Sequence, residues 1–224
     1  MPNTITDEAK IKQLLSRGVE EIFVKEDFEK DLQSGRELRI KFGIDPTGPK
    51  IHLGRAIPIR KLREFQKLGH KIVLIIGDFT AQIGDASDKT EKRPMLTRAA
   101  IDENLKDYKS QIGKILDLDK VEFVYNNDWL SKLTFQDVTQ LAECFTVQQM
   151  LARRNFKDRY DANVEISLRE FLYPLMQGYD SYAVRADVEI GGFDQLFNLK
   201  AGRVIQDFFG MPKQNIMNLQ MLEG

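Results

Sequence analysis

Gly-Ile-Asp-Pro-Thr-Gly-Pro-Lys-Ile-His-Leu-Gly-Arg, residues 43–55, is the stretch around which the rest of the chain is arranged. In residues 38–42 before it, apolar and basic side chains alternate, which is typical of a strand. In residues 57–68 after it, apolar side chains recur at mixed steps that mainly fit a helix, and Gly69 ends that helix. A Gly- and Pro-rich loop therefore leads into a helix start, where free N–H groups and a partial positive charge favour an anion such as a phosphate.

The composition is that of a globular chain without a strong overall field. Its 224 residues suffice for one large α/β domain or two small ones, and 42% hydrophobic residues suffice for a core. With 33 basic and 34 acidic residues, no global charge attracts nucleic acid. Cys144 excludes a disulfide framework and, with two histidines, argues against a structural zinc site, so we expect no bound metal. The N-terminus lacks an apolar signal core and no apolar run reaches membrane-spanning length, so we expect a cytoplasmic protein.

Strands and helices are predicted to alternate along most of the chain. The predicted strands span residues 38–42, 72–76, 121–125, 184–190 and 216–221. This alternation predicts an α/β fold with a Rossmann-like, mostly parallel five-stranded sheet and helices on both faces. The predicted divisions are a helical preface, the first half of the sheet domain, a helical insertion between the two halves, and the second half, spanning residues 1–36, 37–125, 126–165 and 166–224.

Three features near predicted strand ends each allow a structural and a functional interpretation. The charge run 87–93 fits a solvated loop, or a mobile cationic loop that meets a polyphosphate. Tyr173, Gln177 and Asp180 share one face of a predicted helix, either as a polar outer face or as the wall of a pocket. The pair Gly191-Gly192 lets a ligand approach the backbone, or only makes a tight turn.

Five separated motifs occur together and in one order, although each alone is a weak signal. They are Gly43-x-Asp45-Pro46-Thr47, His52-x-Gly54, Gly84-Asp85, Tyr173-x-x-x-Gln177-x-x-Asp180 and Gly191-Gly192-x-Asp194-Gln195. In this combination the chain resembles the catalytic domain of bacterial tyrosyl-tRNA synthetases, which are class I aminoacyl-tRNA synthetases. The resemblance runs from about Leu14 to the last residue, and it makes residues 37–125 and 166–224 the two halves of a nucleotide-binding catalytic domain.

The resemblance implies a two-step reaction. Tyrosine attacks the α-phosphate of ATP to give tyrosyl-adenylate and pyrophosphate, and the tyrosyl group then passes to tRNA(Tyr). No covalent enzyme intermediate is involved, so catalysis depends on positioning and charge stabilisation. The implied small molecules are L-tyrosine and ATP, with Mg²⁺ on the ATP phosphates. A homodimer is implied as well, with an interface around residues 126–165.

The resemblance also implies residue roles. The catalytic residues would be Thr47, His52, Arg55, Lys89 and Arg93. The ATP-binding residues would be Gly43, Asp45, His52, Gly54, Gly192 and Asp194. The tyrosine-binding residues would be Asp85, Tyr173, Gln177, Asp180 and Gln195. Among these, Asp180 would accept the phenol hydrogen bond and so distinguish tyrosine from phenylalanine.

Several positions depart from the family pattern. Arg55 stands where the family's "HIGH" motif has its second histidine, and a guanidinium is larger and always charged. Lys41 and Phe42 occupy positions where many relatives carry a Tyr and a Cys, and Glu189 replaces a Gln. The Lys-rich "KMSKS" loop and the anticodon-binding region are expected after Gly224 and are absent, so the sequence predicts a truncated catalytic domain that activates tyrosine slowly and charges tRNA poorly.

Two alternatives stay open. One is another nucleotidyltransferase with a His-x-Gly-x motif, such as a tryptophanyl-tRNA synthetase, although Asp180 suits a phenol better than the larger indole. The other is a non-catalytic, synthetase-like module that binds structured RNA with salt-dependent affinity and ignores ATP.

Overall fold

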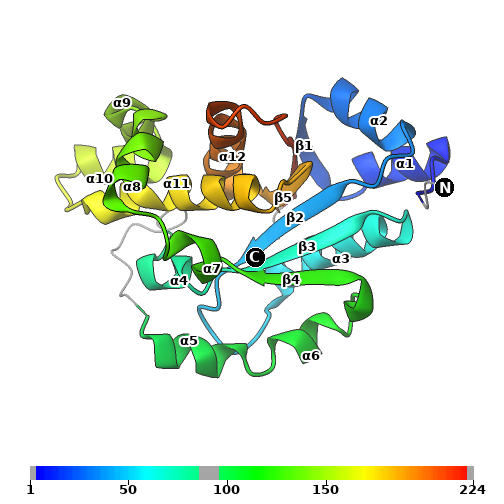
Figure 1. Cartoon of the computed structure of the whole chain (residues 1–224), viewed down its shortest axis with the longest axis horizontal. Helices are drawn as coiled ribbons and strands as arrows, with labels where there is room; N and C mark the ends of the chain where they lie inside the picture. The colour runs from blue at the N-terminus through cyan, green and yellow to red at the C-terminus, as the bar shows by residue number, and fades with distance from the viewer. Residues whose placement is uncertain (1–3, 86–95, 221–224) are drawn as a thin grey trace.

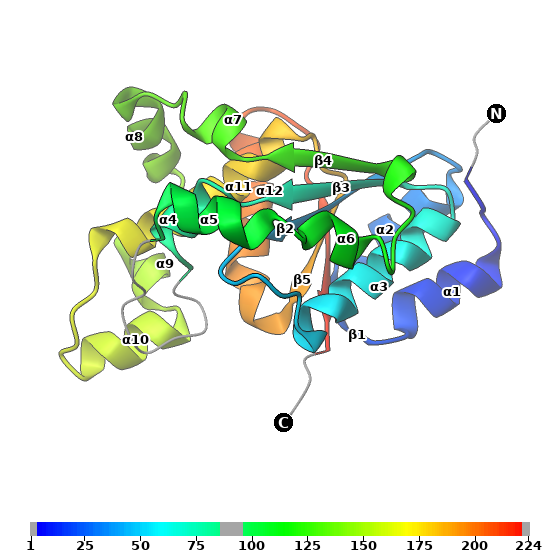
Figure 2. The same cartoon turned by 90° about the horizontal axis from the view of Figure 1, so that it is seen from below.

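A central six-stranded sheet organises the molecule, and Figures 1 and 2 show it from two perpendicular directions. The computed structural model describes residues 4–85 and 96–220. Across the sheet the strand order is β1-β6-β5-β2-β3-β4. In chain order the strands are β1 (Val19–Phe23), β2 (Arg39–Ile44), β3 (Lys71–Ile76), β4 (Val121–Tyr125), β5 (Val188–Gly192) and β6 (Asn215–Leu219). All neighbouring strands are parallel except β1, which pairs with β6 in the antiparallel sense.

Helices fill the connections between the strands. Those before β4 are α1 (Glu8–Ser16), α2 (Lys25–Gln33), α3 (Leu53–Lys67), α4 (Thr80–Ile83), α5 (Arg98–Leu105) and α6 (Tyr108–Ile112). Between β4 and β5 lie α7 (Asn127–Leu130), α8 (Phe135–Glu143), α9 (Val147–Leu151), α10 (Arg154–Asp161) and α11 (Leu168–Ala183), and α12 (Leu196–Phe208) precedes β6. Short 3-10 turns span Leu118–Lys120 and Phe193–Gln195. Capping boxes at Thr134 and Ser167 start α8 and α11.

The sheet is covered on both faces. On one face, alternate residues of β2 and β3 such as Ile40 and Leu74 join a large apolar core with Leu62 and Phe65 of α3 and with side chains of α1 and α6. On the other face, Val73 of β3 packs in a smaller apolar cluster near the end of α11. Helices α11 and α12 lie against each other on this second side (Figure 1).

The α/β class and the mostly parallel sheet are confirmed, but the predicted count of five strands is wrong. The additional strand is β1, which lies within the segment predicted to be a purely helical preface. Two successive glutamates, Glu20 and Glu21, break the alternation of this short edge strand, and its register with β6 shifts at the same place. Its pairing partner lies nearly the whole chain away, so no local pattern reports it.

Two predicted boundaries also differ from the structure. The apolar side chains after Thr97 recur at the spacing of one continuous helix, but the backbone leaves the helical region at Asp107 and two helices, α5 and α6, result. The strand predicted from residue 184 begins at Val188, because α11 runs to Ala183 and Arg185 adopts a positive φ of 51° in the turn that follows.

The position of β2 creates a crevice. Its successor β3 lies on one side of it and β5 on the other, so the chain changes direction across the sheet at β2. Strands β2 and β5 pair over only two rows, Ile40 with Val188 and Lys41 with Glu189. Beyond these rows the carboxyl ends separate, and open α/β sheets bind ligands in crevices of this kind.

Candidate active site

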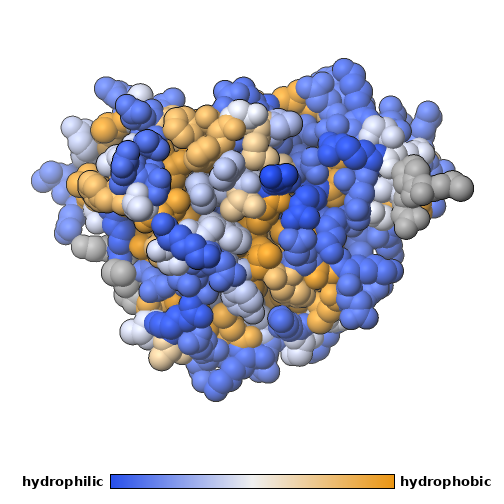
Figure 3. All heavy atoms as spheres, in the orientation of Figure 1, coloured by the Kyte–Doolittle hydropathy of each residue, from blue (hydrophilic) through white to orange (hydrophobic). Residues whose placement is uncertain are grey.

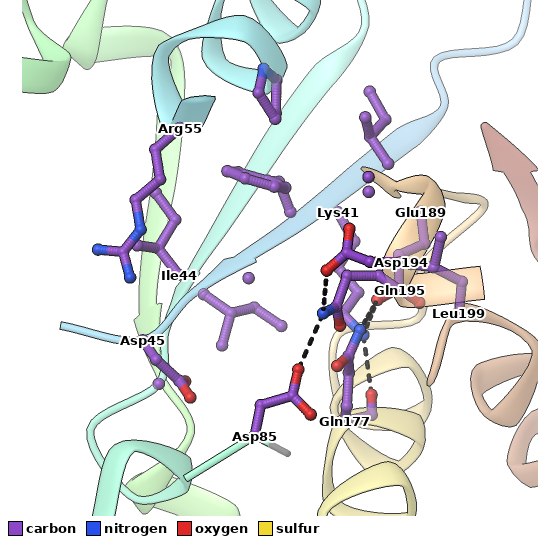
Figure 4. A pocket seen from close by; sticks show the side chains of 18 of the residues that line it. Lys41, Ile44, Asp45, Arg55, Asp85, Gln177, Glu189, Asp194, Gln195 and Leu199 are labelled. Atoms are coloured by element: carbon purple, nitrogen blue, oxygen red, sulfur yellow. Dashed lines mark hydrogen bonds and ion pairs between the residues drawn. The ribbon is translucent and has the colours of Figure 1, made fainter. Parts of the chain in front are cut away.

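A cavity of about 590 Å³ lies at this crevice, a size that suits a small-molecule ligand. Every predicted site residue in the described part of the chain lines it: Gly43, Asp45, Thr47, His52, Gly54, Arg55, Asp85, Tyr173, Gln177, Asp180, Gly192, Asp194 and Gln195. Figure 4 shows Arg55 and Asp45 at one side of the view and Gln177, Asp194 and Gln195 at the other. Lys89 and Arg93, the two remaining candidates, lie outside the described residues.

The loop before α3 holds the predicted phosphate-contacting side. His52 is the N-cap residue of α3, with an extended backbone and an exposed side chain. Its carbonyl oxygen accepts hydrogen bonds from the backbone N–H groups of Arg55 and Ala56. A Cβ atom on Gly54 would lie 3.2 Å from His52 Nδ1, so the imidazole rests closely over the glycine. The imidazole thus stands beside a helix N-terminus, where a partial positive charge favours an anion.

Arg55, the departure from the family's second histidine, braces this loop. Its guanidinium donates to Thr47 Oγ1 and to Tyr108 Oη, both at 2.8 Å. The Tyr108 hydroxyl in turn donates to the Gly48 carbonyl oxygen at 2.9 Å. The cation therefore connects Thr47 of the loop and the first turn of α3 to Tyr108 of α6, and it keeps a positive charge at the cavity wall.

Asp45 connects the loop to the opposite wall. Its carboxylate accepts hydrogen bonds from Thr80 Oγ1 at 2.7 Å and from the Tyr173 hydroxyl at 2.9 Å. Desolvation raises the pKa of Asp45 to about 6, although these two hydrogen bonds oppose the shift. Gly77 is required here, because a Cβ atom at that position would lie 1.9 Å from Asp45 Oδ1. The predicted ATP contact of Asp45 stays a prediction, since in this structure its partners are side chains.

Asp180 lies deep in the cavity, on α11. It is 4% exposed and accepts hydrogen bonds from Trp129 Nε1 at 2.8 Å and from Asn126 Nδ2 at 3.2 Å. Burial raises the pKa of Asp180 to about 7, while the nearby Lys41 charge and the two hydrogen bonds oppose the shift. The two bonds leave lone pairs on the carboxylate that a further donor can use.

The helix face predicted to carry Tyr173, Gln177 and Asp180 points inward. Tyr173 is 8% exposed, and all three side chains line the cavity, so the interpretation as a polar outer face is wrong. Sequence reasoning missed Asn126 and Trp129, which hold Asp180 in place. The available signal was their position directly after β4, where loops of parallel sheets reach the ligand crevice.

A third group of polar side chains lies near the mouth of the cavity. Gln195 Nε2 donates to Asp85 Oδ2 at 2.8 Å and to Asp194 Oδ2 at 2.9 Å, as the dashed lines in Figure 4 show. Asn198 Nδ2 donates to Gln195 Oε1 at 2.9 Å and so fixes the amide in this orientation. Asp85 is buried and Asp194 exposed, so one carboxylate faces the interior and the other the entrance.

The cavity therefore has two chemically distinct sides. Carboxylates on one side suit an ammonium group, hydroxyl groups or a phenol, whereas His52, Arg55 and the start of α3 suit phosphate oxygens. Within residues 4–85 and 96–220, no group of three or more His, Cys, Asp or Glu side chains is arranged to hold a metal ion. The helices of the described residues are each too short or too polar to span a membrane.

Comparison with known proteins places the chain among tRNA synthetases. The family model described as tRNA synthetases class I (W and Y) matches residues 33–224. The tyrosine–tRNA ligase of Nitrosomonas europaea is 49% identical over 212 residues, which cover 95% of this chain and 52% of that protein. The Thermotoga maritima tyrosine–tRNA ligase is 48% identical over 220 residues, 98% of this chain and 55% of that protein. The chain thus spans about half the length of these curated relatives.

Solved structures agree on the fold. A C-terminally truncated mitochondrial tyrosyl-tRNA synthetase of Aspergillus nidulans superposes with a TM-score of 0.80 at 21% identity, covering 97% of this chain and 70% of that one. A tyrosyl-tRNA synthetase of Archaeoglobus fulgidus, complexed with L-tyrosine, gives a TM-score of 0.78 at 24% identity, covering 97% and 65%. At such identities the likeness establishes a shared architecture.

Proposed function

The chain belongs to the class I tRNA synthetase family of tryptophan and tyrosine enzymes, and from this premise we propose that it carries the catalytic site of a tyrosine–tRNA ligase. It would activate L-tyrosine with ATP and transfer the tyrosyl group to tRNA(Tyr). The observation that carries the choice of tyrosine is the buried carboxylate of Asp180, held by Trp129 and Asn126 with lone pairs left for a phenol. Identities of 48% and 49% to tyrosine–tRNA ligases support the same choice over tryptophan.

The tyrosine substrate fits the carboxylate side of the cavity. Its phenol donates to Asp180, and its ammonium group lies among Asp85, Tyr173 and Gln177, while Gln195 faces its carboxylate. Phenylalanine would leave Asp180 desolvated without a new partner, at a cost of about 1–3 kcal/mol.

ATP fits between the His52 side of the cavity and Asp194 near its mouth. Its α-phosphate lies against His52 and the start of α3, with Thr47 as a further donor, and Asp194 accepts hydrogen bonds from the ribose hydroxyls. A tyrosine carboxylate oxygen then forms a bond to the α-phosphorus as the bond to pyrophosphate breaks. Mg²⁺ bound to the ATP phosphates would offset the charge of the leaving group. The protein contributes alignment and preorganised donors, not a nucleophile.

The assembly we propose is a homodimer acting in the cytoplasm, where tRNA is charged. Apolar side chains are exposed on and beside the helical insertion: Phe135 is 84% exposed, Val147 60% and Leu168 79%. Figure 3 shows hydrophobic residues gathered around α11 and α12. Size-exclusion chromatography with light scattering at micromolar concentration should give a molar mass of twice the 25.9 kDa of the chain. The mass of a monomer at that concentration would contradict the dimer.

Calorimetric titration with single amino acids tests the proposed function. We expect L-tyrosine to bind, and L-phenylalanine and L-tryptophan to bind at least about tenfold more weakly, because each lacks a phenol for Asp180. A preference for another amino acid would contradict the tyrosine assignment. Binding of structured RNA with no response to any amino acid or to ATP would instead support a non-catalytic module.

The role of His52 is tested by His52→Ala in a tyrosine-dependent exchange of pyrophosphate into ATP. The imidazole stands at the phosphate side of the cavity, away from Asp180. We therefore expect adenylate formation to slow by roughly a hundredfold while the Kd for tyrosine changes less than about threefold. Equal losses in both would make His52 a structural residue.

A further inference from the structure

A buried ion pair lies in the wall of the cavity. Lys41 Nζ is 2.9 Å from Glu189 Oε1, and their side chains are 1% and 2% exposed. The two residues face each other in the last paired row of β2 and β5, just before these strands separate to form the crevice. Figure 4 shows them beside Gln177, and all three line the cavity. Charges buried so fully carry a large desolvation cost, so their placement calls for an explanation.

Acceptors of the cavity wall surround Lys41. Its ammonium group donates to the Gln177 carbonyl oxygen at 2.9 Å and to Ser181 Oγ at 2.7 Å, and it lies in an ion pair with Glu189 Oε1 at 2.9 Å. Two of the acceptors belong to α11, so Lys41 fixes this helix against β2 at the level of the cavity. Lys41 therefore holds the cavity wall together.

Glu189 is surrounded by donors. Besides Lys41, its carboxylate accepts from Gln177 Nε2 at 3.1 Å, from Ser181 Oγ at 3.0 Å and from Gln214 Nε2 at 2.5 Å. An ionised carboxylate only accepts hydrogen bonds, so the Gln177 amide must turn its NH₂ group toward Glu189. Its carbonyl oxygen is then the amide atom left for the cavity. A glutamine at position 189 would impose no such choice, because its own amide can present either group.

We propose that the Lys41–Glu189 pair is a positioning device that turns the Gln177 carbonyl oxygen into the cavity as an acceptor for the ammonium group of the ligand. This inference rests on the proposed function, because it assumes an amino-acid ligand with its ammonium group near Gln177. Lys41 cancels the charge of Glu189, so the carboxylate orients the amide without adding net negative charge beneath the site. Glu189 and Lys41 thus act through Gln177 and do not touch the ligand.

The test compares ligands that differ only in the ammonium group. Tyramine and tyrosol share the phenol and the two-carbon chain, but tyrosol carries a hydroxyl where tyramine carries the ammonium group. We expect Glu189→Gln to weaken L-tyrosine and tyramine by roughly ten- to a hundredfold and tyrosol by less than about threefold. In a Gln177→Met background, the same substitution should change tyramine binding by less than about threefold.

Glu122→Gln is the matched control. Glu122 on β4 pairs with Arg39 of β2 at 2.9 Å but lies a third exposed and does not line the cavity. It should leave the binding of all three ligands unchanged. If Glu189→Gln does not fold, Lys41→Met/Glu189→Met removes both charges together, and we expect it to show the same selective loss for ligands with an ammonium group.

The possible outcomes distinguish a failure of this inference from a failure of the proposed function. An equal loss for all three ligands would make the pair merely structural, and unchanged tyrosine binding would remove its role altogether. Either result overturns the inference and leaves the proposed function standing, provided that the unaltered chain binds L-tyrosine. Failure of the unaltered chain to bind L-tyrosine would overturn the proposed function and this inference with it.

Discussion

At the centre of the sheet, strands β2 and β5 present alternate residues to the two faces and bury opposite kinds of side chain there. Toward α1 and α3, strand β2 presents Ile40 and β5 presents Val188, both fully buried in the large apolar core. Toward α11, the same strands present Lys41 and Glu189, equally buried. The difference teaches that burial serves two purposes here: the apolar face supplies stability, and the charged face supplies a fixed geometry for the binding site.

The largest expected effect distinguishes the loss of one charge of the Lys41–Glu189 ion pair from the loss of both charges. Lys41→Met leaves Glu189 buried without its cation, so we expect the free energy of unfolding to fall by about 3–5 kcal/mol in urea titrations. Lys41→Met/Glu189→Met removes both charges and should cost much less than the single change. If the single and double variants lose the same stability, the charged face contributes by packing alone.

The apolar face is tested by Leu74→Ala on β3. Leu74 is fully buried and does not line the cavity. We expect a loss of about 2–5 kcal/mol in the free energy of unfolding, because the truncation leaves a cavity in the core. The Kd for tyrosine, measured well below the new melting temperature, should change less than about threefold. A large loss of affinity would show that the two faces do not have separate roles.

A smaller effect is expected for Asp180→Asn, which removes the acceptor charge at the deep end of the cavity. The preference for tyrosine over phenylalanine should fall by about 1–3 kcal/mol, since the carboxamide accepts the phenol hydrogen bond more weakly. Competition titrations with the two amino acids measure it. Unchanged selectivity would place the phenol elsewhere.

The smallest effect is a pH dependence. Burial raises the pKa of Asp180 to about 7, so below that pH the carboxyl group is increasingly protonated and is a poorer acceptor. Tyrosine affinity should therefore rise about tenfold between pH 6 and pH 8, following the ionised fraction of this group. Phenylalanine, which lacks the hydroxyl, serves as the control, and Asp180→Asn should flatten the tyrosine profile. A slope that survives in Asp180→Asn would belong to Asp45, whose pKa is raised to about 6.

Residue patterns predicted the parts of the fold that depend on local order. The uninterrupted apolar run of β3 depends on near neighbours in the sequence, and the strand, Lys71–Ile76, includes the whole predicted range 72–76. Strand β1 escaped prediction because its pairing with β6 joins distant segments. In the same way, the periodicity of α11 showed that Gln177 and Asp180 share a face but not that this face points inward.

The same limit applies to the candidate site: local patterns identified some of its residues, and contacts between distant segments were not predicted. Motifs marked the residues that line the cavity, but not their partners: Trp129 and Asn126 reach Asp180 from the loop after β4, and no spacing in the sequence links them. Glu189 carried a usable signal, since it is a charge within the otherwise apolar strand β5, whereas Lys41 shares strand β2 with the basic Arg39. Only the register of β2 with β5 shows that the two charges meet.

The most direct measurement is a crystal structure of the chain with L-tyrosine bound. The account predicts the phenolic oxygen within about 3.2 Å of the Asp180 carboxylate, with the ammonium group beside Asp85 and the Gln177 carbonyl oxygen. Tyrosine bound outside this cavity, or inside it with its carboxylate toward the start of α11 and its phenol toward His52, would contradict the account.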